Sequence, residues 1–343
     1  MGTTSADVRG DTDATRSEAR EPGPGPGRAP GGPHARTRPP ALRRMTNWLT
    51  AFAFTVPALL LFGALVLLPI LFALYSSFFN WGGFGWPSDF TGLGNFSKLV
   101  KDPVFIGDLW RGFLLIAFSL LIQLPFSLAI AVMLNQRLRG RAFYRMLFFA
   151  PYILSEVITG VLFSMIFAPG DGLADKIFSE LGLEALGGKW FSDPSTVLPT
   201  LFLAMTWKYF GFHMMLYLAG LQGIPAELHE AAKIDGAGPW ERFRYVTLPL
   251  LGPTIRISAF LSVIYSIQLL DMVWVITGGG PDHASETMAI TMFQYGFKRY
   301  QVGYASTISV AMFLISLVFA LLYQRFVMRR DTEGALTTMR AQR

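Results

Sequence analysis

The apolar residues of this 343-residue chain gather in long runs that are nearly free of charge and are separated by short charged segments. A helix needs about 20 mostly apolar residues to cross the hydrocarbon core of a bilayer. The runs are continuously apolar rather than alternating, so they indicate helices and not the strands of a membrane barrel. We predict an all-α polytopic membrane protein with six transmembrane helices, over about 51–78, 112–136, 146–168, 196–222, 257–278 and 300–324.

The ends of the chain differ from this middle. Residues 1–45 contain seven Gly, seven Pro and no aromatic residue. Such a segment cannot bury enough apolar area to offset the entropy of ordering, so we predict a disordered tail. The predicted domains are therefore the tail 1–45, a membrane domain 46–330 and a C-terminal tail 331–343.

Lysine and arginine are unevenly distributed among the segments that flank these runs. Placing the N-terminus inside puts 21 of the 29 basic residues in the inner tails and loops and 7 in the outer loops. Cytoplasmic loops carry such an excess. We therefore predict a multi-pass protein of the cell membrane with both termini in the cytoplasm.

Composition excludes several other classes. Only 15% of residues are charged and mean hydropathy is +0.41, which argues against a soluble globular enzyme. The absence of cysteine excludes disulfide scaffolds, thiolate metal sites and cysteine nucleophiles, and four scattered histidines do not indicate a metal site. The net charge of +6 lies in the tail and short loops, so it indicates membrane topology rather than nucleic-acid binding.

The loop 223–250 between the fourth and fifth runs is the most informative segment. Pro225 suits the first turn of a helix, Gly236 suits its end, and Pro239 can open a second short helix. Two membrane helices would hold this helix-break-helix at the membrane face as a rigid protrusion. An ordinary amphipathic interfacial loop is the alternative, and periodicity alone does not distinguish the two.

A spaced pattern makes this loop specific. Glu230-Ala231-Ala232, three residues, Gly236, nine residues and then 246–249 (Val-Thr-Leu-Pro) resembles the EAA signature of importer-type ABC permeases, which prefer Ile where this chain has Val246. Residues 277–281 (Thr-Gly-Gly-Gly-Pro) and 303–306 (Gly-Tyr-Ala-Ser) are similar to features of the carbohydrate branch, the relatives of the maltose permease subunits. The resemblance covers about residues 50–328.

The resemblance implies the type I ABC importer permease fold and a set of partners. These are a second permease subunit in a heterodimer, two ATP-binding cassette ATPase subunits, an extracytoplasmic solute-binding protein, a sugar substrate and membrane lipid, without nucleic acid. The loop would be the coupling helix that lodges in the ATPase surface. Its residues implied in ATPase coupling are Glu230, Ala231, Ala232, Asp235 and Gly236.

The chain does not carry the residues for ATP hydrolysis. A P-loop needs Gly, four residues and then Gly-Lys-Ser/Thr. The nearest string, 187–190 (Gly-Gly-Lys-Trp), lacks the first glycine and the hydroxyl. We therefore expect no catalytic residue, no enzymatic activity and no cofactor in this chain, with ATP used by partner subunits.

Three charged residues lie inside predicted membrane helices: Glu156, Lys208 and Asp271. A charge inside the membrane is costly and usually faces a cavity or a partner charge. We favour positions along a solute path, with Asp271 the weakest candidate because it lies near the outer half of its helix. A structural ion pair between Glu156 and Lys208 is the alternative.

In the maltose-type relatives, sugar contacts come from the middle of the third to fifth spans. Aromatic rings cover the apolar faces of sugars, and polar side chains hydrogen-bond their hydroxyls. The resemblance implies solute contacts at Tyr152, Glu156, Lys208, Tyr209, Phe212, Tyr265, Ser266 and Leu269.

The predicted function is the permease subunit of an ATP-driven sugar or oligosaccharide importer. An importer of a polyol or glycerol phosphate is the alternative within the class, because a phosphate would explain Lys208. A secondary transporter would need inverted repeats, and no convincing repeat is found. A membrane-embedded enzyme would need a cluster of catalytic groups, which Glu156, Lys208 and Asp271 on separate helices do not provide.

Overall fold

The computed structural model describes residues 41–136, 138–183 and 188–328. Most of the predicted N-terminal tail and the whole predicted C-terminal tail therefore lie outside the described residues. The chain divides into two compact units, residues 1–60 and 61–343. Helix α1 (Ala41–Phe62) is the described part of the first unit and runs across the boundary, and it begins within the predicted tail 1–45.

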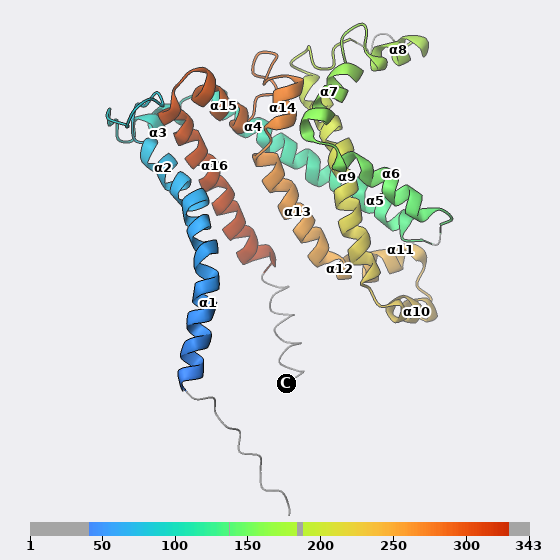
Figure 1. Ribbon diagram of the computed structural model, residues 1–343. Coiled ribbons are helices and arrows are strands. Elements are labelled where there is room, and N and C mark those ends of the chain that lie inside the picture. Colours follow the sequence, from blue (N-terminus) through green and yellow to red (C-terminus); the bar gives the residue numbers. More distant parts are fainter. Residues whose placement is uncertain (1–40, 137, 184–187, 329–343) are drawn as a thin grey trace, which may run out of the picture. The chain divides into compact units, whose positions relative to one another are not determined.

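The second unit is helical, and an isolated bridge between Phe79 and Phe90 is the only β pairing in its described residues (Figure 1). The first half contains η1 (Gly63–Leu67), α2 (Leu68–Ser76), α3 (Gly94–Leu99), α4 (Pro103–Phe118), η2 (Ser119–Gln123), α5 (Leu124–Leu134), α6 (Arg141–Ile153), α7 (Glu156–Ile166) and α8 (Leu173–Glu180). The second half contains α9 (Val197–Gln222), α10 (Ala226–Ile234), α11 (Pro239–Arg242), η4 (Phe243–Thr247), α12 (Leu248–Leu250), α13 (Gly252–Ile267), α14 (Asp271–Ile276), α15 (Met288–Phe293), η5 (Gln294–Lys298), α16 (Val302–Tyr323) and η6 (Gln324–Met328).

Several of the η elements are π-helical turns with a common sequence cause. The turns η1, η2 and η4 are each followed at once by Leu-Pro, at Pro69, Pro125 and Pro249. A proline lacks the N–H that would bond the carbonyl four residues earlier, and its ring crowds that carbonyl. A wider turn before the proline relieves this conflict, so the helix continues through it.

Within the described residues, three helices are long and apolar enough to cross a membrane, and the number rises to five if two bent pairs each count as one span. These segments are Phe52–Ser76, Pro103–Leu134 and Val302–Met328, and the bent pairs Arg141–Ile153 with Glu156–Ile166 and Pro239–Leu250 with Gly252–Ile267. The fourth predicted run, 196–222, is not among these segments and corresponds to α9, whose 26 residues include the polar side chains Lys208 and His213. The count of six spans stays a prediction.

The second predicted span differs in its start. The helix begins at Pro103, capped by Asp102, which accepts the Val104 N–H at 2.9 Å, rather than near residue 112. It therefore runs through Asp108 and Arg111, whose side chains form an ion pair at 2.6 Å. Charges that neutralise each other do not end a helix. The predicted span, which began directly after Arg111, therefore starts too late.

The third predicted span is broken. Helices α6 and α7 meet at an angle of 96° around Leu154 and Ser155. Leu154 has an extended backbone, and the Ser155 hydroxyl accepts the Ile158 N–H at 3.2 Å as the N-cap of α7. The fifth predicted span likewise ends early, since α13 stops at Ile267 and α14 begins at Asp271.

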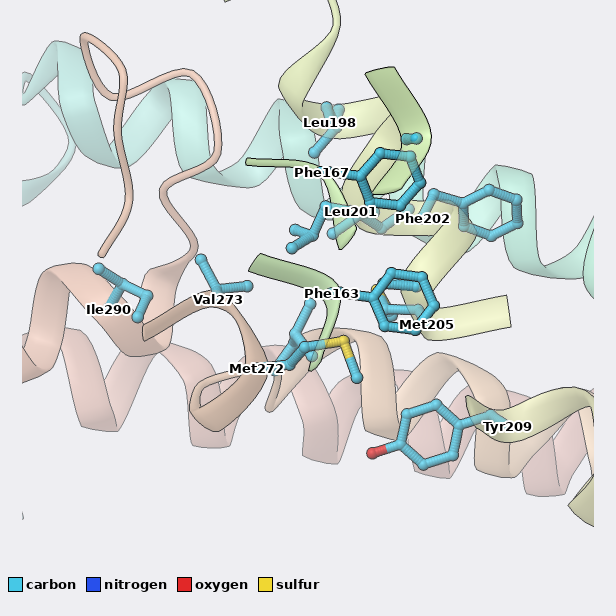
Figure 2. Packing of buried hydrophobic residues seen from close by; sticks show 14 residues of the cluster. Phe163, Phe167, Leu198, Leu201, Phe202, Met205, Tyr209, Met272, Val273 and Ile290 are labelled. Atoms are coloured by element: carbon cyan, nitrogen blue, oxygen red, sulfur yellow. The ribbon is translucent and has the colours of Figure 1, made fainter. Parts of the chain in front are cut away.

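Helix α9 packs against both sides of this break. It contacts α5, α6, α7 and α13 (Figure 1), and 16 of its 26 residues are buried. Figure 2 shows the apolar cluster that α9 forms with α7, α14 and α15, which includes Phe163, Leu201, Met205, Met272 and Ile290. Shielding by neighbouring helices explains why α9 carries polar residues that an exposed membrane helix would not.

The segment between α7 and α9 is organised by one carboxylate. Asp175 accepts the indole N–H of Trp190 at 2.6 Å and the backbone N–H groups of Gly170 and Gly188, each at 2.7 Å. These hydrogen bonds hold the pKa of Asp175 below its ordinary value of 3.8. The carboxylate form therefore joins the two ends of this segment at neutral pH.

Candidate functional site

A cavity of about 330 Å³ with many polar lining residues lies where η2, α7, α9, α13 and the start of α14 approach one another. Helix α7 contributes a residue here because the break before it turns its first residue toward α9. The cavity is lined by Ser119, Gln123, Glu156, Met205, Tyr209, His213, Ser262, Tyr265, Ser266, Gln268, Leu269, Leu270 and Asp271.

One wall of the cavity consists of uncharged polar groups. The hydroxyls of Ser119 and Ser262 lie 2.6 Å apart, and Ser119 also donates to the Gln123 side-chain oxygen. Gln123 in turn donates to the Met205 carbonyl at 3.4 Å. Each group has a partner, as buried polar atoms require. This wall offers hydroxyl and amide groups to a solute without exposing an unpaired charge.

His213 joins this wall from α9. Its ring is 1% exposed, and its Nδ1 lies 2.7 Å from the hydroxyl of Ser258 on α13. That contact fixes the ring plane between α9 and α13. The remaining ring nitrogen is the group that His213 can offer to the cavity.

A second group of lining residues combines a carboxylate with stacked aromatic rings. Tyr209 donates its hydroxyl proton to Glu156 on α7. The rings of Tyr209 and Tyr265 stack at 5.8 Å with an interplanar angle of 17°. Tyr152, whose ring centroid lies 6.2 Å from that of Tyr209, stacks on Phe212 at 4.9 Å. Stacked rings beside a carboxylate and hydroxyls match the mixed apolar and polar faces of a sugar.

Lys208 does not line the cavity. It is 3% exposed, and its amine donates to the Leu154 carbonyl at 2.5 Å. That carbonyl lies at the C-terminal end of α6, where the helix no longer supplies an N–H partner. A cation at a helix C-terminus also interacts favourably with the negative end of the helix dipole. Lys208 therefore stabilises the break between α6 and α7.

This contact leads to a prediction for Lys208→Met. Removing a hydrogen bond from a charged donor costs about 2 kcal/mol, so we expect lower thermal stability of the purified complex with little change in half-saturating solute concentration. Lys208→Arg keeps a donor and serves as the control. Unchanged stability with an altered half-saturating concentration would instead make Lys208 a solute contact.

The second candidate site is the loop after α9. Pro225 precedes α10, and Gly236 ends it with a φ of +84°, a conformation that favours glycine. The Gly238 N–H donates to the Glu241 side chain at 2.7 Å and so caps α11. The result is the predicted helix-break-helix.

Helix α10 exposes the residues that the EAA pattern singled out. Glu230, Ala231, Asp235 and Gly236 are exposed and Ala232 is half-buried. Leu228 and Ile234 on the same helix are 43% and 85% exposed. Helix α10 therefore exposes large apolar side chains beside its carboxylates.

Comparison of the sequence with models of known protein families identifies the family of this chain. The family model described as "binding-protein-dependent transport system inner membrane component" matches residues 123–332. The chain belongs to this family. The matched part of this transport component begins at Gln123 and contains the loop after α9 and every residue that lines the cavity except Ser119.

Curated relatives match this transport component along most of its length. The diacetylchitobiose uptake system permease protein of Streptomyces coelicolor is 34% identical, over 88% of this chain and 89% of the relative. A probable ABC transporter permease protein of Pyrococcus horikoshii is 33% identical, over 82% and 97%. The lactose transport system permease protein of Rhizobium radiobacter is 31% identical, over 84% and 95%.

Solved structures give the fold. This transport component matches a chain in the crystal structure of a bacterial ABC transporter involved in the import of the acidic polysaccharide alginate, with a TM-score of 0.74 and 20% identity, over 84% of this chain and 98% of that one. A second structure, of a bacterial alginate ABC transporter with its pentasaccharide-bound periplasmic protein, matches with the same TM-score. The expected all-α ABC importer permease fold and the resemblance to carbohydrate permeases are confirmed.

The structure brings together five of the eight residues implied as solute contacts: Glu156, Tyr209, Tyr265, Ser266 and Leu269. Tyr152 contacts the ring of Tyr209 and stacks on Phe212. The Lys208 amine donates to the Leu154 carbonyl at the break between α6 and α7. Glu156 and Lys208 form no ion pair with each other among the described residues. Asp271, the weakest candidate, lines the cavity.

Sequence reasoning identified only part of the uncharged lining of this site. The residues that it missed are Ser119, Gln123, Met205, His213, Ser262, Gln268 and Leu270. A signal was present, since Ser119 and Gln123 are four residues apart in an otherwise apolar run and so share one helix face. Whether the lining residues contact solute stays a prediction.

Proposed function

We propose that this transport component is the membrane-spanning permease subunit of an ATP-driven ABC importer for a sugar or oligosaccharide. The observation that carries the proposal is the cavity itself: a space of about 330 Å³ inside a membrane helix bundle, lined by hydroxyls, two amides, carboxylates and tyrosine rings. Relatives named for diacetylchitobiose and lactose transport support the same solute class.

In this proposal an extracytoplasmic binding protein delivers the sugar, and a second permease subunit completes the pathway. Two ATPase subunits bind on the cytoplasmic side, with the helix α10 lodged in one of them. Both termini of the chain lie in the cytoplasm, as the basic residues predict. ATP-driven closure of the ATPases moves α10 and the attached helices α9 and α13 as rigid bodies, which alternates access to the cavity.

The cavity residues have separate tasks. Tyr209 and Tyr265 present ring faces to the apolar side of a sugar ring. Glu156, held by the Tyr209 hydroxyl, accepts hydrogen bonds from sugar hydroxyls, while Gln123 and the serines donate and accept. Because α7 carries Glu156 directly after the break, movement of α6 against α9 changes the shape of the site.

The alternative of a glycerol phosphate importer depended on Lys208 as the phosphate-binding cation. Lys208 donates to Leu154 instead and does not line the cavity. The carboxylates Glu156 and Asp271 that do line it would repel a phosphate. We therefore favour a solute without a phosphate group.

Uptake measurements with Tyr265→Ala test the cavity assignment. Losing one ring of the Tyr209–Tyr265 stack weakens the free energy of sugar binding by about 1 kcal/mol. We therefore expect the half-saturating sugar concentration to rise about fivefold. The assay is uptake of labelled sugars by proteoliposomes that contain the whole transporter and its binding protein. Tyr300→Ala, a change at a 59% exposed tyrosine outside the cavity, is the matched control. Equal uptake kinetics in wild type and Tyr265→Ala would place the solute elsewhere.

A further inference from the structure

Two cavities adjoin where α5 meets the loop after α10. The first, about 210 Å³, is polar and is lined by Val132, Asn135, Gln136, Leu221, His229, Pro239, Arg242, Phe243 and Thr247. The second, about 640 Å³, is apolar and is lined by Pro125, Leu128, Ala129, Val132, Met133, Pro239, Trp240, Phe243 and Leu248. Val132, Pro239 and Phe243 line both, so a single elongated ligand reaches both cavities.

The polar cavity is suited to an anion. Arg242 and His229 are the titratable side chains among its described lining residues, and no carboxylate is among them. The Arg242 Nε is buried and has no hydrogen-bond partner within the described chain. A buried guanidinium N–H without an acceptor is costly. An anionic oxygen in the cavity would remove that cost.

Nearby carboxylates do not fill this role. Glu241 accepts the Gly238 N–H at 2.7 Å and does not line the cavity. Glu227, Glu230 and Asp235 are exposed on α10 and also do not line the cavity. No carboxylate of the described residues supplies the anion, which favours a separate molecule as its source.

The apolar cavity is suited to a hydrocarbon chain. It extends along the outer side of α5, where Met133 is 58% exposed, to Trp240, which is 70% exposed. Trp240 and Phe243 lie with ring centroids 5.5 Å apart at its edge. Tryptophan concentrates at the membrane interface, where its ring meets both acyl chains and water.

The junction of the two cavities lies at the end of a membrane-spanning segment. The apolar segment Pro103–Leu134 ends there, and the polar residues Asn135 and Gln136 follow directly. Arg139, Arg141 and Arg145 come next along the chain. Basic pockets at the cytoplasmic ends of membrane helices bind anionic lipid head groups.

We propose that this pair of cavities binds one anionic phospholipid. Its phosphate accepts hydrogen bonds from the Arg242 guanidinium in the polar cavity, and one acyl chain lies in the apolar cavity along α5. The lipid would thereby join α5, which faces the membrane, to α11, which follows the coupling helix. Acidic lipid in the bilayer then supports the position of α10 from behind. The assignment does not depend on which solute the transporter carries.

Photo-labelling of the assembled transporter tests this site. The probe is phosphatidylglycerol with a diazirine in one acyl chain, incorporated in phosphatidylcholine vesicles that contain the transporter. After irradiation, we expect mass spectrometry to find labelled peptides from residues 125–133 and 239–248. Arg242→Gln removes a charge-assisted hydrogen bond and should lower this labelling about tenfold.

Two further variants make the test specific. Arg244→Gln changes an exposed arginine two residues away and should label like wild type. Ala129→Trp fills the apolar cavity without touching Arg242 and should also reduce labelling, which keeps the test valid if Arg242→Gln disturbs folding. Equal labelling in Arg242→Gln and wild type would overturn the proposal.

Other outcomes would also overturn the proposal. Labelling by a phosphatidylcholine probe as strong as by phosphatidylglycerol would mean that the anionic phosphate is not recognised. Thermal stabilisation by inorganic phosphate, lost in Arg242→Gln and without any acyl labelling, would identify a free-phosphate site. Cross-links from this region to another subunit in place of lipid would show a protein interface.

Discussion

Glu230→Ala should lower ATP-driven solute uptake at least thirtyfold while the subunit still inserts and assembles. Glu230 is exposed on α10 and forms no ion pair among the described residues, so removing it costs the isolated chain little. In the proposed complex it pairs with a basic residue of an ATPase. Losing one partner of a buried charge pair costs about 2–5 kcal/mol, or a factor of about 30 or more.

The measurement compares uptake and ATP hydrolysis in proteoliposomes of equal subunit content. Glu227→Ala is the matched control, because Glu227 is exposed one turn earlier on the same helix and is not among the residues implied in coupling. We expect near-normal uptake in the control. Normal ATP-driven uptake in Glu230→Ala would remove the coupling role from α10.

Gly211→Ala should destabilise the helix bundle by about 3 kcal/mol or more, because the packed backbone must move apart. A Cβ atom at Gly211 would lie 2.0 Å from the Phe148 carbonyl oxygen and 3.1 Å from the Phe149 Cα. These are backbone atoms of α6, so no side-chain rotation relieves the overlap. Helix α6 would have to shift from α9, and the contact from Lys208 to Leu154 would be strained with it.

Thermal unfolding of the purified complex, followed by loss of its gel-filtration peak, measures this effect. Gly112→Ala is the control, because Gly112 is also buried inside a helix but has no atom within 4 Å of an added Cβ. Alanine favours a helix by about 1 kcal/mol over glycine, so the control should be unchanged or slightly more stable. Equal stability of the two variants would contradict the close α6–α9 packing.

The membrane helices were predictable because the bilayer imposes a simple rule on the sequence. Apolar runs without charge located the helices, and errors arose where charges neutralise each other. Asp108 and Arg111 pair at 2.6 Å within α4, so the helix starts at Pro103. A rule that counts charges singly does not detect such pairs.

The break in the third span had a weaker signal. Ser155 before Glu156 has the composition of a helix N-cap, but the surrounding residues are apolar enough to continue one helix. The carbonyl freed at Leu154 is tolerated because Lys208 reaches it from α9. That contact joins residues 54 positions apart, so local sequence could not reveal it.

The candidate sites differ in how far the sequence predicted them. The loop 223–250 is local, and its glycine and prolines predicted the helix-break-helix shape that the structure has. The role of its EAA residues in coupling stays a prediction. The cavity is assembled from five helical elements that are far apart in the sequence. Intramembrane charge pointed to Glu156 and Asp271, whereas Ser119, Gln123 and His213 are uncharged or singly placed and became visible only once the helices were packed.

Cysteine cross-linking of α10 tests the central claim most directly, since the chain has no native cysteine. A single cysteine at Ile234, which is 85% exposed on α10, should cross-link to an ATPase subunit in the assembled transporter, in a way that changes when ATP is added. A cysteine at Phe84, 79% exposed between α2 and α3, should give no such product. No ATPase cross-link from Ile234→Cys, together with solute accumulation that does not depend on ATP, would contradict the account.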